Sequence, residues 1–156
     1  MMRTISSITA LVLLAAVRVA QPADVSVEEH IIALERGALE RWGKGDPQGF
    51  FDIMSNDETY FDPITAKRID GLDALRNFMA PFTGKISIDR FEMIGPKVQR
   101  HGDVAILTFN LVNDGAQFSG GPKSIARWNS TEIYRRVNGR WKIVHSHWSY
   151  TKPELK

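Results

Sequence analysis

The sequence contains no cysteine, which excludes a disulfide framework, a thiol nucleophile and a lipid anchor on a cysteine. It also lacks a G-x-S-x-G nucleophile elbow, a phosphate-binding loop and a dinucleotide fingerprint. Serine-hydrolase chemistry of the common type and nucleotide-dependent chemistry therefore have no support, and we expect no cofactor. No internal repeat or low-complexity segment divides the chain, so we expect one domain with one core.

A short apolar run near the start is typical of a secretory signal peptide. Arg3 precedes the run ITALVLLAAV, residues 8–17, and small residues follow it in RVAQPA. This run is too short to span a bilayer. We expect residues 1–23 to be removed on export to the periplasm or the medium, at a cleavage site that the sequence leaves open. Residues 24–156 are then the mature domain.

The mature domain is expected to have no net charge. The whole chain has 20 basic and 18 acidic residues, but Arg3 and Arg18 lie in residues 1–23, which contain no acid. The remaining 18 basic residues are balanced by 18 acidic ones, so the pI of about 9.0 for the whole chain does not indicate a basic face. Nucleic acid is therefore not an expected partner.

The first half of the mature chain has the periodicity of helices. Ser26 and Glu29 form an S-x-x-E capping box, and apolar residues follow at helical spacing. The apolar stripe consists of Val27, Ile31, Leu34, Ala38 and Trp42. Asp46 as N-cap and Pro47 at the first helical position predict a second, short helix. ETYFDP then predicts a short strand, and GLDALRNFMAPF predicts a third helix that ends near Pro81.

From Lys85 onward the sequence is rich in β-branched and aromatic residues, which indicates strands. These strand-like segments are separated by Gly-Pro, His-Gly-Asp, Gly-Gly-Pro and Asn-Gly turn signals. The stretch from Val137 to Arg140, with Asn-Gly at its centre, predicts a tight hairpin. Helices first and antiparallel strands later predict an α+β domain in which the sheet curls over the helices.

Three passages carry a family resemblance: WGKGDPQGFFDIMSND, FDP followed by DGLD, and YRRVNGRWKIVHSHWS. Together with the order of the elements, they resemble the nuclear transport factor 2-like superfamily. This superfamily includes ketosteroid isomerases, SnoaL-like polyketide cyclases and the association domain of calcium/calmodulin-dependent kinase II. The association domain and its stand-alone bacterial relatives are the most similar, and the likeness covers residues 27–150.

The resemblance implies a cone-shaped roll of three N-terminal helices packed in a curved, mainly antiparallel sheet, with an internal cavity. It also implies a homodimer or a higher homo-oligomer that forms through the outer face of the sheet. Members of the superfamily use the cavity for very different purposes, so the fold alone does not choose a function.

Asp62 is the first candidate for chemistry. By the resemblance, it lies where ketosteroid isomerases carry their general base in a D-P pair. Loss of hydration in an apolar cavity makes a carboxylate a stronger base, as proton transfer requires. The local alternative is that Asp62-Pro63 only begins a turn.

Glu132 is the second candidate, and it shares one face of the predicted strand 130–137 with Tyr134. The resemblance places Glu132 at or next to the isomerase acid that donates to the substrate oxyanion, and two acids in one cavity can divide the acid and base roles. The isomerases also use a tyrosine from the first helix, where this chain has Ala38, and this argues against steroid-type isomerisation. The alternative for Glu132 is an ion pair across the sheet with Arg127, Arg135 or Lys142.

Trp148 is expected to form an aromatic wall of the cavity. Alternation places Val144, Ser146 and Trp148 on one face of the last strand. In the kinase association domain, the matching places of Glu132 and Trp148 carry arginines that hold an anion, so an acid and an indole favour a small apolar or neutral ligand. The predicted ligand-binding residues are Tyr60, Asp62, Glu132, Tyr134, Ser146 and Trp148.

His145 and His147 are predicted to lie on the opposite face of the same strand. Two imidazoles could share a metal ion, but a catalytic zinc normally takes three protein ligands, and no third ligand is evident in the sequence. We therefore predict no metal site and interpret the two histidines as outer-face residues at a subunit contact.

Two functions remain. The first is an exported, self-associating domain that binds a small molecule and performs no chemistry. The second is a cofactor-independent isomerase, cyclase or dehydratase that uses Asp62 as general base and Glu132 as proton donor on an apolar carbonyl substrate. The absent helix tyrosine favours the first, and Asp62 at the matching place keeps the second open.

Overall fold

The computed structural model describes residues 25–152, and the predicted signal peptide, residues 1–23, lies outside this range. The helices are α1 (Val27–Trp42), α2 (Gln48–Phe51) and α3 (Leu72–Met79), and a 3-10 turn (Ala80–Phe82) follows α3. The strands are β1 (Met54–Phe61), β2 (Ile69–Asp70), β3 (Ile86–Ser87), β4 (Arg90–His101), β5 (Val104–Phe118), β6 (Ser124–Val137) and β7 (Arg140–Tyr150).

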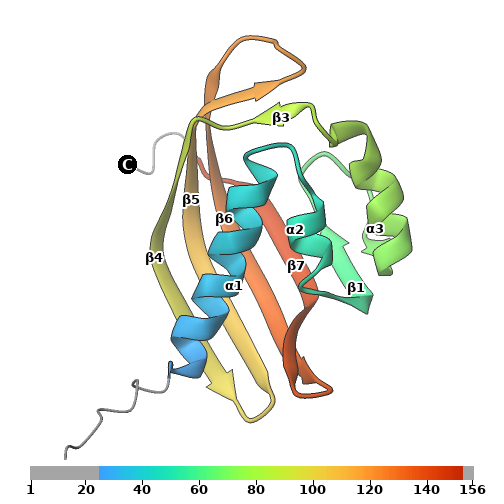
Figure 1. Ribbon diagram of the computed structural model, residues 1–156, viewed down its shortest axis with the longest axis vertical. Coiled ribbons are helices and arrows are strands. Elements are labelled where there is room, and N and C mark those ends of the chain that lie inside the picture. The colour runs from blue at the N-terminus through green and yellow to red at the C-terminus, as the bar shows by residue number, and fades with distance from the viewer. Residues whose placement is uncertain (1–24, 153–156) are drawn as a thin grey trace, which may run out of the picture.

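The strands form one curved sheet in the order β2-β1-β7-β6-β5, and β5 also pairs with β3 and β4. Every pair is antiparallel except β1 with β7, which is parallel. Figure 1 shows the long strands β4 to β7 side by side, with α1 lying across their face and α2 and α3 toward β1. The predicted α+β class, with three helices against a curved, mainly antiparallel sheet, is confirmed.

Helix α1 begins at the predicted capping box. The Glu29 N–H donates to Ser26 Oγ at 3.1 Å, and the Ser26 N–H donates to Glu29 Oε2 at 3.0 Å. The buried residues of the helix are Ile31, Glu35, Ala38 and Leu39. The predicted stripe members Leu34 and Trp42 are only half-buried. The buried face is thus rotated slightly from the predicted stripe, and it includes an acid.

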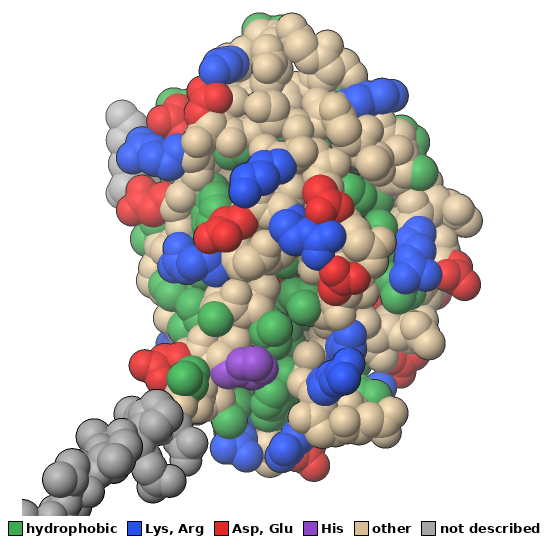
Figure 2. All heavy atoms as spheres, viewed as in Figure 1, with side chains coloured by type: hydrophobic (Ala, Val, Ile, Leu, Met, Phe, Trp, Pro, Cys, Tyr) green, Lys and Arg blue, Asp and Glu red, His purple; other side chains and the backbone are tan. Residues whose placement is uncertain are grey.

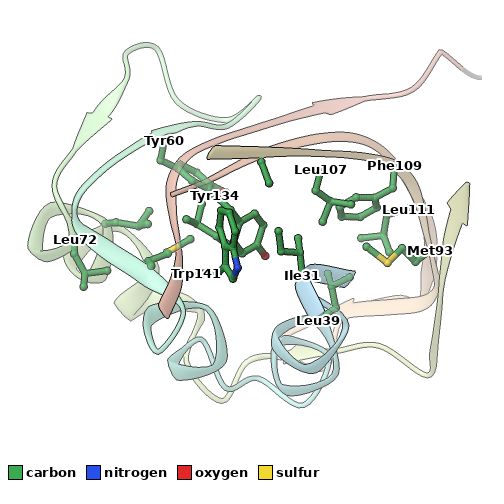
Figure 3. Packing of buried hydrophobic residues seen from close by; sticks show 14 residues of the cluster. Ile31, Leu39, Tyr60, Leu72, Met93, Leu107, Phe109, Leu111, Tyr134 and Trp141 are labelled. Atoms are coloured by element: carbon green, nitrogen blue, oxygen red, sulfur yellow. The ribbon is translucent and has the colours of Figure 1, made fainter. Parts of the chain in front are cut away.

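The core lies between α1 and the concave face of the sheet. Alternate side chains of β5 point inward: Ala105, Leu107, Phe109 and Leu111. Figure 3 shows Ile31 and Leu39 of α1 in the same cluster, with Tyr134 near its centre. Full burial of one such aliphatic side chain stabilises the fold by about 1.5–3 kcal/mol. This stabilisation is gained only when the apolar face of α1 packs on the inward face of β5, so these two faces determine how the helix lies on the sheet.

The Gly95-Pro96 pair does not separate two strands, contrary to the sequence prediction. β4 continues through it as a bulge, because the register with β5 shifts between Ile94 and Lys97. Gly95 takes a positive φ of 57°, which suits a bulge. Since β4 pairs with β5 on one side only, Pro96 can occupy this edge strand without breaking the sheet.

A second bulge changes the faces of β7. Ile133 of β6 faces His145, whereas Tyr134 faces Ile143, so Val144 is an extra residue in β7. The prediction that Val144 lies on the same face of the strand as Ser146 and Trp148 is therefore wrong.

Helix α2 begins at Gln48, one residue later than predicted, and Pro47 takes the N-cap position. Asp46 still closes this end of the helix, because its Oδ1 accepts from the Gln48 N–H at 3.0 Å. The other oxygen of Asp46 accepts from Arg41 Nε at 2.7 Å and ties the turn to α1.

The surface carries both signs of charge close together. Figure 2 shows Lys and Arg interspersed with Asp and Glu across the face on which α1 lies. Surface ion pairs include Arg135–Asp57 at 2.9 Å and Lys123–Asp89 at 2.6 Å. On this face the pattern agrees with the expected absence of a basic surface. No helix within residues 25–152 is both long and apolar enough to cross a membrane.

The hairpin between β6 and β7 is confirmed. β6 ends at Val137 and β7 begins at Arg140. The two residues between them, Asn138 and Gly139, have positive φ values of 49° and 79°, as a type I′ turn requires.

A matched pair of glycine substitutions tests the close approach of β5 to Asp89. Gly115 and Gly102 have nearly equal φ values of 66° and 64°, but a Cβ on Gly115 would lie 2.1 Å from Asp89 Oδ2, while none would be within 4 Å at Gly102. We expect Gly102→Ala to lower the free energy of unfolding by about 1 kcal/mol from the left-handed backbone alone. Gly115→Ala should cost about 1–3 kcal/mol more, because the contact must be relieved. Urea unfolding of both variants measures this, and equal losses would contradict it.

Candidate functional site

Two adjoining pockets lie where α3, the 3-10 turn and the ends of β5 and β6 meet. The small pocket has a volume of about 90 Å³ and the large pocket about 390 Å³. Both are lined mostly by apolar and aromatic side chains. The residues that line both are Trp42, Tyr60, Asp62, Met79, Asn113 and Trp128. The larger volume is within the range of pockets that hold small molecules.

Asp62 both forms a turn and lines the two pockets. The Tyr60 hydroxyl donates to Asp62 Oδ2 at 2.8 Å, and the Ile64 N–H donates to Oδ1 at 2.9 Å. The Asp62 carbonyl oxygen accepts from the Thr65 N–H at 3.1 Å and so closes the turn after β1. The two interpretations of the sequence are therefore compatible, because the turn holds the carboxylate at the pocket.

Tryptophans form much of the pocket wall. Trp148 lines the small pocket, and its ring meets that of Trp128 edge-on, with centroids 6.2 Å apart and planes at 85°. Trp148 also meets Phe109 edge-on at 5.7 Å. Trp128 Nε1 and Asn113 Oδ1 are buried without a hydrogen-bond partner among the residues that the structure describes.

Three glutamates are buried together beneath this region, and we call them the glutamate cluster: Glu35 of α1, Glu58 of β1 and Glu132 of β6. Each is at most 1% exposed. Ser146 Oγ lies 2.8 Å from Glu58 Oε1 and 2.5 Å from Glu132 Oε2. The Tyr134 hydroxyl donates to Glu35 Oε2 at 2.6 Å. None of the ion pairs between residues 25 and 152 includes a member of the cluster.

The geometry at Ser146 favours a proton on the cluster. A serine hydroxyl has one proton to donate, yet its oxygen lies within hydrogen-bond distance of Glu58 and Glu132. The hydroxyl donates to one carboxyl group and accepts from the other. This arrangement favours a proton on one of the two glutamates in the folded state.

Burial is the main cause of this protonation. It raises the pKa of Glu58 to about 8, and the nearby charges of Asp57 and Glu35 act in the same direction. Burial likewise raises the pKa of Glu35, and it raises that of Glu132 well above the ordinary range, where the charge of Glu35 adds to the effect. The phenol pKa of Tyr134 is also raised by burial.

The structure divides the predicted ligand-binding residues into two groups. Tyr60, Asp62 and Trp148 line the small pocket. Glu132, Tyr134 and Ser146 belong to the buried network of the glutamate cluster. Their catalytic and ligand-binding roles stay predictions.

The expected ion pair of Glu132 with a basic residue of the sheet is wrong. Glu132 points into the interior, where it accepts from Ser130 at 3.2 Å and contacts Ser146. Arg135 points the other way and pairs with Asp57. The cause is the alternation of β6, which places even-numbered residues inside and odd-numbered residues outside.

Sequence reasoning missed two members of the glutamate cluster, Glu35 and Glu58. Glu35 is four residues after Ile31 and four before Leu39, so its position on the apolar face of α1 could have been found. Glu58 is two residues before Tyr60 on the inward face of β1. In both cases the periodicity places the acid on the buried face, although acids are usually exposed.

His145 and His147 lie on the outer face of the sheet beside Phe61, whose ring centroid is 6.0 Å from His145 and 5.6 Å from His147. His145 Nδ1 is 2.8 Å from Thr59 Oγ1. Burial and the neighbouring His147 lower the pKa of His145. The described residues contain no group of three or more histidine, aspartate or glutamate side chains that could hold a metal ion.

The glutamate cluster predicts that stability falls with rising pH. Below about pH 4.5, its ordinary pKa, Glu58 is protonated in both the folded and the unfolded chain, and above about pH 8 it is protonated in neither. Between these values the unfolded chain loses the proton and the folded chain keeps it, so the free energy of unfolding decreases. Glu58→Gln should match the wild type near pH 4.5 and exceed it by at least about 1.4 kcal/mol at pH 8.5, the free energy of one pKa unit.

Urea unfolding across this pH range measures the difference, with Glu40→Gln on the exposed face of α1 as the control. The control should follow the wild type at every pH. If the Glu58→Gln curve ran parallel to the wild type, the raised pKa would be contradicted.

The sequence profile of the calcium/calmodulin dependent protein kinase II association domain matches residues 27–152. The crystal structure of a putative ketosteroid isomerase from Parabacteroides distasonis is 38% identical, with 82% of this chain and 90% of that chain covered and a TM-score of 0.69. The S. rosetta CaMKII hub is 21% identical, with 83% and 100% covered and a TM-score of 0.67. An NTF2-like protein of unknown function from Pseudomonas putida is 22% identical, with 82% and 89% covered and a TM-score of 0.68. No curated protein sequence matches the chain.

The two matches near 20% identity show the fold alone, which is the nuclear transport factor 2-like roll described above. The profile match goes further, because it extends over nearly all of the described residues, from the first turn of α1 to the end of β7. The chain belongs to the calcium/calmodulin dependent protein kinase II association domain family, within the nuclear transport factor 2-like superfamily.

Proposed function

We propose that this chain is a self-associating domain that binds a small, mainly apolar molecule in the paired pockets. The observation that carries the proposal is the lining itself, in which tryptophans surround one hydrogen-bonded acid, Asp62. Apolar walls with a few placed polar groups are typical of small-molecule sites. The apolar or neutral ligand expected from the sequence is consistent with this lining.

Export is part of the proposal and rests on the sequence of residues 1–23. The absence of cysteine means that no disulfide stabilises the domain. Its core supplies the stability instead, through the inward side chains of β5 and α1.

Self-association is supported by family membership and by the outer face of the sheet. The matching family is an association domain, and one of the similar structures is a hub. On this chain the outer face presents Phe61, which is 40% exposed, next to His145 and His147. An exposed aromatic ring flanked by two partly apolar rings is a suitable centre for a contact between copies.

The second candidate function is proton transfer on a carbonyl substrate with Asp62 as general base. Two observations favour it: Asp62 lines both pockets, and the 38% identical Parabacteroides protein is described as a putative ketosteroid isomerase. Glu132, the expected proton donor, is not among the pocket-lining residues within the described range, and Ala38 is buried in α1. Under this function Asp62→Asn would abolish turnover, whereas a protein without chemistry has no turnover to lose.

Ligand binding is tested by filling the large pocket. Ala126 lines that pocket, whereas its neighbour Ile125 is 59% exposed and does not. In a thermal-shift screen of apolar ketones, lactones, steroids and aromatic compounds, a ligand at a hundred times its Kd should stabilise the wild type by about 2.7 kcal/mol. Ala126→Phe should remove this stabilisation and Ile125→Phe should retain it. A ligand that stabilised all three proteins equally would bind elsewhere and contradict the site.

Self-association is tested by placing a charge at the centre of the outer face. We expect the wild type to sediment as a dimer or a larger assembly and Phe61→Asp to sediment as a smaller species, because a carboxylate would be buried in the contact. The control is Ile64→Asp, since Ile64 is 60% exposed but lies in the turn after β1 rather than on the sheet. A strictly monomeric wild type at micromolar concentration would refute self-association.

A further inference from the structure

We propose that the paired pockets select a small organic cation, a tertiary or quaternary ammonium with an apolar body. This inference rests on the proposed function, because it names the chemical class of ligand for the same site. It concerns the charge of the ligand, which the fold does not specify.

The charge of the lining points to a cation. Asp62 is the only charged side chain among the described residues that line either pocket, and no lysine, arginine or histidine accompanies it. An anion would therefore meet a carboxylate without a compensating base. A neutral ligand would remove water from Asp62 and leave its charge uncompensated, which costs free energy. A cation offsets that cost directly through its opposite charge.

The aromatic rings supply the second half of a cation site. Near α3, Tyr60 of β1 meets Phe78 at 6.3 Å between centroids, and Phe78 meets Phe82 at 5.9 Å. On the sheet side, Trp128 meets Trp148 at 6.2 Å and Tyr150 at 4.5 Å. The face of an aromatic ring is negative and attracts a cation, tryptophan most strongly. Aromatic rings in one lining with a carboxylate are an arrangement that can recognise alkylated ammonium groups.

The hydrogen bonds of Asp62 favour an alkylated ammonium over a primary amine. Each carboxylate oxygen already accepts one bond, from the Tyr60 hydroxyl and from the Ile64 N–H. A primary ammonium has three N–H donors to satisfy, and each would have to find an acceptor among Asp62, Asn113 and the other polar groups of the lining. A quaternary ammonium has no N–H group, so it needs only charge and contact. The large pocket, with about 390 Å³, has room for such a group.

Three probes of one shape separate charge from size: choline, its neutral carbon analogue 3,3-dimethylbutan-1-ol, and the anion 3,3-dimethylbutanoate. Titration calorimetry on the purified protein at low and moderate salt gives each affinity. We expect choline to bind at least tenfold more tightly than the alcohol, and the anion not to bind. Equal affinities for choline and the alcohol would overturn the proposal.

Variants locate the effect. Asp62→Asn should weaken choline binding at least tenfold and leave the alcohol unchanged, whereas Asp57→Asn, an acid on the outer side of β1, should change neither. Trp128→Leu keeps an apolar side chain but removes the ring, and it should weaken choline more than the alcohol. This second variant keeps the test valid if Asp62→Asn disturbs the turn. Choline affinity that neither variant changes would overturn the proposal.

The outcomes distinguish this inference from the proposed function. If a neutral compound of the earlier screen binds and is blocked by Ala126→Phe while choline does not bind, the cation preference fails and the ligand site stands. If no compound of either set binds, both fail.

Discussion

The structure depends on carboxyl groups that are buried without a basic partner. Glu35, Glu58 and Glu132 come from a helix and two strands, and they meet in the apolar interior. An ionised carboxylate there would cost several kcal/mol unless a base compensated it, so the groups are held as neutral or proton-sharing hydrogen-bonded partners. Ser146 of β7 forms hydrogen bonds with Glu58 of β1 and Glu132 of β6. Tyr134 of β6 donates to Glu35 and so links the sheet to α1. The folded state is therefore also a proton-binding state.

This arrangement separates the acids of the interior from the acid of the pocket. Glu58, Tyr60 and Asp62 follow one another at every second position of β1 and the turn after it. Glu58 is buried in the interior, whereas Asp62 lies just after the end of β1 and lines the pockets. A ligand in the pockets thus meets one carboxylate and not four. The Asp62 carboxylate is therefore the charged group that a ligand meets, and its position is fixed by its hydrogen bonds. Either ligand selection or proton transfer would depend on it.

The sequence predicted the fold well because its signals are local and redundant. The capping box at Ser26, the α+β order of elements and the Asn138-Gly139 turn each determine backbone geometry within a few residues. The site was harder to predict. Glu35 and Glu58 were missed because acids are usually exposed, and the partner that accommodates each lies 99 and 88 residues away along the chain, at Tyr134 and Ser146. Such pairing exists only after the strands have their register.

One extra residue in β7 determines which side chains of β7 point into the core and which point outward. Up to Ile143, odd-numbered residues of β7 point inward, and without Val144 as a bulge His145 and His147 would follow them into the core. The bulge reverses the alternation, so Ser146 meets Glu58 and Glu132, and Trp148 reaches the pocket wall. The same reversal sends the two histidines to the outer face beside Phe61. The pocket and the proposed association surface are thus opposite faces of one short segment, and a change in register would alter both together.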